Sequence, residues 1–139
     1  MAKYESSSAE QTKQIAEELA KNTTGNIFAL NGELGAGKTI FVQGFARGLG
    51  IKDKIISPTF VLMRQHYIPA QKKVLYHIDL YRLENLKDIK NLGLEEIWSD
   101  QNSIVLIEWA EKIKTLLPKN TVTIRLEKTA EDKRLITIE

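Results

Sequence analysis

The amino-acid sequence predicts an α/β fold in which helices cover both faces of a mixed, mainly parallel β-sheet, and three observations support this. In the first third of the chain, a strand pattern lies between two helical patterns, which is typical of the β-α-β units of a parallel sheet. Two pairs of neighbouring strand patterns are each joined by a short polar segment, which favours antiparallel hairpins. The chain has 139 residues and no cysteine, so it is long enough for one hydrophobic core without disulfides.

Local signals set the elements of the first half. Ser8 and Gln11 fit a capping box, in which each side chain satisfies a backbone N–H group at the start of a helix. Apolar residues then recur at helical spacing until a polar stretch at 22–25. A short apolar run over 26–31 indicates a buried strand, and a broad apolar face indicates a second helix from Lys38 to about Arg47, closed by glycines.

The second half predicts further strands, short helices and the two hairpins. In chain order, we expect strands at 60–67 and 74–79, helices at 83–92, 94–98 and 110–117, and strands at 103–108, 122–126 and 135–138. The first two strands form one hairpin and the last two form the other. Because no linker or repeat interrupts these elements, residues 1–139 are expected to form one domain.

Composition limits the classes of function. Lysine and arginine number 20 and aspartate and glutamate 18, and this net charge of +2 is too small to attract DNA, RNA or an anionic membrane over a long distance. The longest strongly apolar run, at 104–107, is far shorter than the ~20 residues that cross a bilayer, and the N-terminus carries no signal pattern. We therefore expect a cytoplasmic protein that binds neither membranes nor DNA.

A glycine cluster between the first expected strand and the second helix carries the clearest chemical signal. Residues 32–39, Gly-Glu-Leu-Gly-Ala-Gly-Lys-Thr, fit the pattern G-x-x-x-x-G-K-(S/T) in the context that it requires. Such glycines let phosphate oxygens approach main-chain N–H groups, and the following helix adds the positive end of its dipole. A chance match is expected in roughly one chain in a few hundred of this size. The motif predicts a P-loop NTPase-like fold and a set of nucleotide-binding residues: Glu33, Leu34, Gly35, Ala36, Gly37, Lys38 and Thr39.

Two carboxylates are candidates for the metal side of this site. Mg²⁺ on a nucleotide needs hard oxygen ligands, which the Thr39 hydroxyl and a carboxylate at the end of a neighbouring strand supply. Asp79 and Glu108 each follow a short apolar strand pattern. We expect both to lie near the metal and to act with Lys38 in catalysis, and spacing alone leaves open which one orients the attacking water.

The nucleotide is expected to be ATP. Guanine-specific GTPases use an Asn-Lys-x-Asp signature, and the nearest segment here, 85–88, has the wrong order. A small-molecule phosphotransferase remains an alternative, although only three arginines precede Arg125 and few residues remain for a lid.

Four segments in combination resemble the TsaE (YjeE) family of P-loop ATPases, over nearly the whole chain. They are 32–39, 57–60 (Ser-Pro-Thr-Phe), 77–83 (His-Ile-Asp-Leu-Tyr-Arg-Leu) and 107–109 (Ile-Glu-Trp). The resemblance implies an ATPase that is weak alone and works with the TsaB and TsaD proteins, which transfer a threonylcarbamoyl group to adenosine 37 of tRNAs that read codons beginning with A. The tRNA is then an indirect partner.

The resemblance also implies individual roles. Thr39 and Glu108 would hold Mg²⁺, Asp79 would lie near the metal or the water, and Trp109 would lie near the nucleotide. Thr12 would approach the adenine and Arg134 the nucleotide. One departure is Ala110, where many relatives have proline, and it changes the stiffness of the chain more than its chemistry.

Several residues keep two interpretations. Ser57 and Thr59 are predicted to form a switch-like loop that senses the γ-phosphate, or else only a turn before a strand. His77 is interpreted as a structural or interface histidine more readily than as a base. The whole protein has an alternative too, namely an ATP-dependent binding switch in which turnover is not required.

Overall fold

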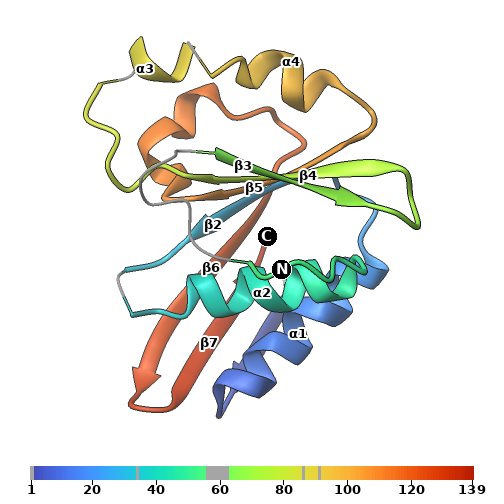
Figure 1. Cartoon of the computed structure of the whole chain (residues 1–139). Coiled ribbons are helices and arrows are strands. Elements are labelled where there is room, and N and C mark those ends of the chain that lie inside the picture. The colour runs from blue at the N-terminus through green and yellow to red at the C-terminus, as the bar shows by residue number, and fades with distance from the viewer. Residues whose placement is uncertain (1, 34, 56–62, 86, 91) are drawn as a thin grey trace.

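The computed structural model describes residues 2–33, 35–55, 63–85, 87–90 and 92–139 (Figure 1). Its sheet contains seven strands among the described residues, in the order β1-β7-β6-β2-β5-β4-β3. These strands are β1 (Ala2–Ser6), β2 (Ile27–Asn31), β3 (Met63–Ile68), β4 (Lys73–Asp79), β5 (Ser103–Glu108), β6 (Val122–Ala130) and β7 (Lys133–Ile138). The central strands β6, β2, β5 and β4 are parallel, and antiparallel pairs add β3 at one edge and β7 and β1 at the other. The predicted mixed sheet and both hairpins are confirmed.

Helices cover both faces of this sheet, which confirms the predicted three layers. The helices α1 (Ala9–Asn22) and α2 (Lys38–Gly48) lie on one face, and α3 (Lys87–Lys90), α4 (Leu94–Ser99) and the 3₁₀ segment η1 (Ala110–Leu116) lie on the other (Figure 1). In the part of the chain that is described, no helix is long and apolar enough to cross a membrane.

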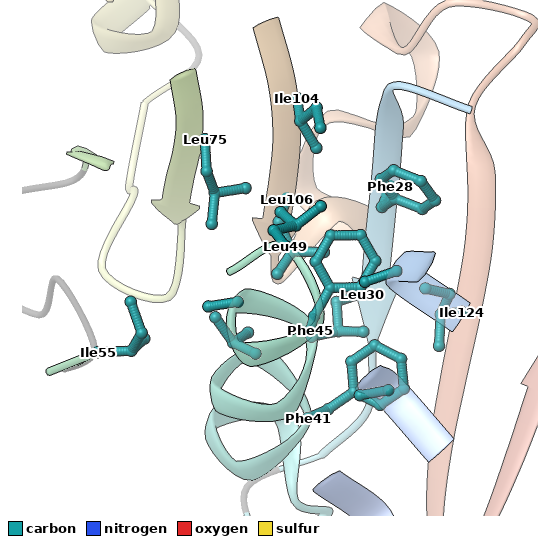
Figure 2. Close-up of a cluster of buried hydrophobic side chains, with 14 of the residues drawn as sticks. Phe28, Leu30, Phe41, Phe45, Leu49, Ile55, Leu75, Ile104, Leu106 and Ile124 are labelled. Atoms are coloured by element: carbon teal, nitrogen blue, oxygen red, sulfur yellow. The ribbon is translucent and has the colours of Figure 1, made fainter. Parts of the chain in front are cut away.

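Alternation along the buried strands gives each face its own core. On β2, Phe28 and Leu30 point toward α1 and α2, whereas Ile27 and Ala29 pack on the opposite face. Figure 2 shows the first core, in which the rings of Phe41 and Phe45, both from α2, fill the space between the helix and the strands. Because both faces of β2 and β5 are buried, these strands are almost continuously apolar, as parallel central strands are.

Helix α1 starts where the capping signal places it. The Ser8 side chain accepts a hydrogen bond from the Gln11 backbone N–H (3.0 Å), and Gln11 Oε1 accepts one from the N–H of Ser7 (2.6 Å). The return bond thus goes to the residue before the cap, not to the cap itself. Both bonds satisfy donors that lack a helical partner.

The packing of α1 on α2 is so close that it depends on glycine. A Cβ atom added at Gly44 would overlap the backbone of Lys13, and one added at Gly48 would lie 2.5 Å from the Glu17 carbonyl oxygen. Arg47 then bridges to α1 at the surface, with 2.7 Å between its Nε and Glu17 Oε2. Its hydrogen bond lowers the pKa of the Glu17 carboxyl.

We expect Gly44→Ala to destabilise the protein, because a backbone segment of α1 must move to admit the methyl group. The expected loss is about 1–3 kcal/mol in the free energy of unfolding, measured by urea denaturation. Gly25→Ala is the matched control: the nearest atom to its added Cβ is a side-chain methyl of Val122, 3.1 Å away. Equal losses in the two variants would contradict the backbone contact as the cause.

Two elements differ from the sequence predictions. Strand β1 was not predicted; it is short and mostly exposed, and pairing with β7 holds it at the sheet edge in place of an apolar face. The predicted helix over 83–92 is wrong in extent, since of the residues described in that range only those of α3 are helical. The Asn85 side chain accepts a hydrogen bond from the Lys87 N–H (3.0 Å) as an N-cap does, so the helix starts later than the apolar spacing indicates.

Candidate functional site

The loop between β2 and α2 needs its glycines for backbone reasons. Gly35 and Gly37 have positive φ angles of 82° and 98°, which strain any residue with a Cβ atom. At Gly32 an added Cβ would lie 2.7 Å from the carbonyl oxygen of Leu126. The pattern that predicted a phosphate-binding loop is therefore required by the conformation of the loop itself.

Lys38, the first residue of α2, is a buried cation with only 6% of its surface exposed. Its Nζ donates to the Gly32 carbonyl oxygen and lies 3.5 Å from the centroid of the Trp109 ring. Burial lowers the pKa of Lys38, while the negative charges of Glu108, Glu111 and Asp79 act in the opposite direction. The ammonium group is thus held by a carbonyl and an aromatic face beside carboxylates.

Asp79 and Glu108 end adjacent parallel strands and are paired directly in register. Both are buried, and Asp79 Oδ1 accepts a hydrogen bond from the Tyr81 N–H (2.9 Å). Their side chains belong to the face of the sheet that α2 covers, since Leu75 and Leu106, which lie an even number of residues before them on the same strands, pack in the core on that face. The structure therefore brings the two predicted carboxylates together near the first turn of α2.

His77, interpreted from the sequence as a structural or interface histidine, lies in the site beside Glu108. Its Nε2–H donates to Glu108 Oε2 over 2.6 Å, and His77 is fully buried. The signal that points to it is its spacing: it lies two residues before Asp79 on β4, so both side chains project from the same face. The bond holds Glu108 Oε2 in place.

Trp109 follows Glu108 in a left-handed conformation, with φ 59°, which is uncommon for a residue other than glycine. Its ring centroid lies 5.1 Å from that of Tyr81, so the two aromatic residues form one wall above Lys38. Lys112 holds the Tyr81 segment by donating to the Tyr81 and Leu83 carbonyl oxygens. Backbone strain at such a position is characteristic of ligand sites.

Two cavities flank the glycine loop. The smaller, about 120 Å³, brings together Thr12 of α1, Gly37, and Arg134 of β7. Within it, the Thr12 hydroxyl already shares a hydrogen bond of 2.6 Å with Ser6, and the Arg134 guanidinium contacts the loop backbone. The larger cavity, about 720 Å³, lies on the other side of the loop and is bordered by Gly32, Glu33 and Trp109.

The remaining predicted site residues differ in how exposed they are. Glu33 and Gly35 are exposed, Ala36 is buried, and Thr39 is half-buried in the first turn of α2. Leu34 and the predicted switch residues Ser57 and Thr59 lie outside the described residues.

A metal ion on a nucleotide fits the donors that are present. Across the described ranges, no group of three or more His, Cys, Asp or Glu residues forms a metal site of its own. The Thr39 hydroxyl and the carboxylates of Asp79 and Glu108 are the hard oxygen donors that Mg²⁺ prefers, and this ion commonly completes its shell with phosphate oxygens and water. The residues thus suit a metal that arrives with a polyphosphate better than a resident metal.

The chain is similar to known proteins in both sequence and structure. The family model described as "Threonylcarbamoyl adenosine biosynthesis protein TsaE" matches residues 6–136. The tRNA threonylcarbamoyladenosine biosynthesis protein TsaE of Treponema pallidum is 42% identical over 114 residues, which span 82% of each chain. That of Bacillus subtilis is 38% identical over 136 residues, which span 97% of this chain and 83% of the relative.

A solved structure agrees with the sequence matches. The crystal structure of Bacillus subtilis YdiB aligns with a TM-score of 0.80 and 34% sequence identity, over 99% of this chain and 83% of that one. With a family model that covers all but the ends, and relatives of this identity and coverage, the chain belongs to the TsaE family.

Proposed function

We propose that this protein is an Mg²⁺-dependent ATPase that assists TsaB and TsaD in the threonylcarbamoyl modification of adenosine 37 in tRNAs that read codons beginning with A. Membership of the TsaE family links the chain to threonylcarbamoyl adenosine biosynthesis. One observation supports the ATPase activity above all: a glycine loop and a buried lysine lie beside two paired carboxylates.

The residues of the loop divide the work of holding the phosphates. Gly35 and Gly37 adopt the left-handed conformations that turn main-chain N–H groups toward an anion, and α2 adds the positive end of its dipole. The Lys38 ammonium would exchange its hydrogen bond to the Gly32 carbonyl for bonds to the β- and γ-phosphates. Burial disfavours the charged form of Lys38, and the phosphates would give that charge an anionic partner. On the proposed function, the base lies in the cavity between Thr12 and Arg134.

The carboxylates serve the metal and the water. Thr39, Glu108 and Asp79 would hold Mg²⁺, which neutralises charge on the phosphates when it is bound. His77 fixes Glu108 Oε2, so the orientation of the whole carboxylate is defined. Glu108 or Asp79 orients the attacking water and accepts its hydrogen bond. Trp109 covers the lysine and limits access of bulk water from the side of its ring.

The proposal includes partner proteins because the small net charge of the chain gives it little long-range attraction for tRNA. The net charge is +2, so direct tRNA binding would lack the electrostatic term that such binding needs. We place the protein in the cytoplasm, acting on the TsaB-TsaD assembly that holds the tRNA.

The test is ATP hydrolysis by the purified protein with and without TsaB and TsaD from the same organism. We expect slow phosphate release by the protein alone and faster release with both partners. Equal rates would contradict activation by the partners. If neither mixture releases phosphate and calorimetry detects no ATP binding, the ATPase proposal itself fails.

A further inference from the structure

The Arg134 guanidinium joins two parts of the chain that are nearly a hundred residues apart. On one side its Nε donates to the Ala36 carbonyl oxygen (3.2 Å) and its Nη2 to that of Gly35 (3.0 Å), both in the glycine loop. On the other side its Nη1 donates to the carbonyl oxygens of Ala130, Glu131 and Lys133, at 3.0–3.3 Å, around the turn between β6 and β7. All three nitrogens of the side chain therefore contact main-chain carbonyls.

This contact controls the orientation of a peptide that the phosphate site needs. The described peptide bonds include no cis bond, so the carbonyl of Ala36 and the N–H of Gly37 point in opposite directions. Nε of Arg134 fixes that carbonyl, and the Gly37 N–H is thereby directed away from the guanidinium. The guanidinium also packs close to Gly37, where an added Cβ would lie 3.7 Å from Nε.

The turn side of the contact holds the guanidinium itself in place. Arg134 is the second residue of β7 and pairs with both Lys128 of β6 and Ser6 of β1, so its backbone is fixed within the sheet. The register shift between Lys128 and Ala130 marks an irregularity just before the turn, which is where the Nη1 acceptors lie. A planar guanidinium offers donors in several fixed directions, and an ammonium group offers them from one point.

We infer that Arg134 is a positioning residue that braces the phosphate loop against the β6-β7 turn and holds the loop in its binding conformation before any nucleotide arrives. This differs from the role beside the nucleotide that the resemblance to the TsaE family implies for it. The inference rests on the proposed function in one respect, because it takes the loop to be the phosphate site. It predicts that the shape of the guanidinium matters as well as its charge.

The test compares Arg134→Lys, which keeps the charge but loses the planar fork, with Arg134→Gln, which loses the charge. Hydrogen exchange of the nucleotide-free protein is followed by NMR at the Ala36 amide, which donates to the Glu33 carbonyl oxygen within the loop (3.0 Å). The Val105 amide, bonded to the Asn26 carbonyl oxygen in the sheet (2.7 Å), is the internal reference. ADP affinity is measured on the same samples by calorimetry.

Both variants are expected to speed exchange at Ala36 by about ten-fold or more and to weaken ADP binding by a similar factor, with Val105 unchanged. Arg64→Lys and Arg64→Gln are the matched controls, because Arg64 lies exposed on the edge strand β3, and they should behave as the wild type.

Four results would overturn the proposed positioning role. Wild-type behaviour of Arg134→Lys would leave charge as the only requirement, and weaker ADP binding with unchanged Ala36 exchange would make Arg134 only a ligand. Faster exchange with unchanged ADP binding would separate the contact from nucleotide binding, and equal acceleration at Val105 would indicate general destabilisation. If the wild type binds no nucleotide, the proposed function fails, while exchange in the nucleotide-free protein still decides whether the brace exists.

Discussion

Replacing Lys38 with alanine is expected to weaken ATP and ADP binding by roughly 10- to 100-fold. On the proposed function, the lysine supplies a charged hydrogen-bond donor to the phosphates, and losing one such bond costs about 1.5–3 kcal/mol. In the structure this side chain lies within the proposed site, between the Gly32 carbonyl and the Trp109 ring. Its approach to a ligand therefore needs little ordering of a long side chain, and most of the interaction energy remains available for binding.

The matched variant is Lys38→Met, which keeps an unbranched side chain beneath the Trp109 ring and removes the charge. Both variants should lose affinity in calorimetry, and the methionine variant should keep its stability to urea, because burial disfavours the charge that it removes. If Lys38→Met bound ADP as tightly as the wild type, the charge would have no part in binding. Unchanged affinity in both variants would remove the loop from the nucleotide site.

Replacing Glu108 with glutamine is expected to lower ATP hydrolysis by about 100-fold or more, with metal-free ADP binding retained. The amide keeps the length of the side chain and an oxygen that accepts the His77 Nε2–H bond, so the buried pair survives. What it loses is the negative charge beside the metal and the ability to accept a proton from water, and that class of contribution is worth roughly 100- to 10,000-fold.

The control is Glu95→Gln, since Glu95 lies exposed on α4 on the opposite face of the sheet. Phosphate release by this variant should match the wild type. A Glu108→Gln variant that hydrolyses ATP at the wild-type rate would exclude Glu108 from the reaction and leave Asp79 as the candidate. In cells, Glu108→Gln also separates turnover from binding: full tRNA modification in such a strain would favour the ATP-dependent binding switch.

The central part of the fold could be predicted because its signals are local. The strand at 103–108 and the helix that starts at Lys38 agree with the structure because apolar runs, glycines and charges lie within a few residues of one another. Strand β1 could not be predicted, since its stability comes from a β7 partner more than 120 residues away. The helix over 83–92 failed for another reason, as the Asn85 cap competes with the apolar spacing.

The same distinction holds within the candidate site. The glycine loop and the carboxylates at strand ends carry signals in their own segments, and the structure brings them together. The His77 contact with Glu108 depends on the register of β4 against β5, and the Arg134 contact with the loop depends on the turn of a distant hairpin. Neither strand register nor turn geometry can be derived from residue spacing, so these two contacts could not be predicted from the sequence.

The close packing of α1 on α2 has a consequence for the spacing between two parts of the proposed nucleotide site. At Gly44 the backbone of α2 packs directly against the backbone of Lys13, which is next to Thr12. Thr12 lies on the base side of the proposed site and Lys38 on the phosphate side. The distance between Thr12 and Lys38 is thus set by the packing of the two helices. On the proposed function, the adenine side and the phosphate side of the site are then held at a fixed spacing by the fold, and holding a nucleotide needs no movement of one helix against the other.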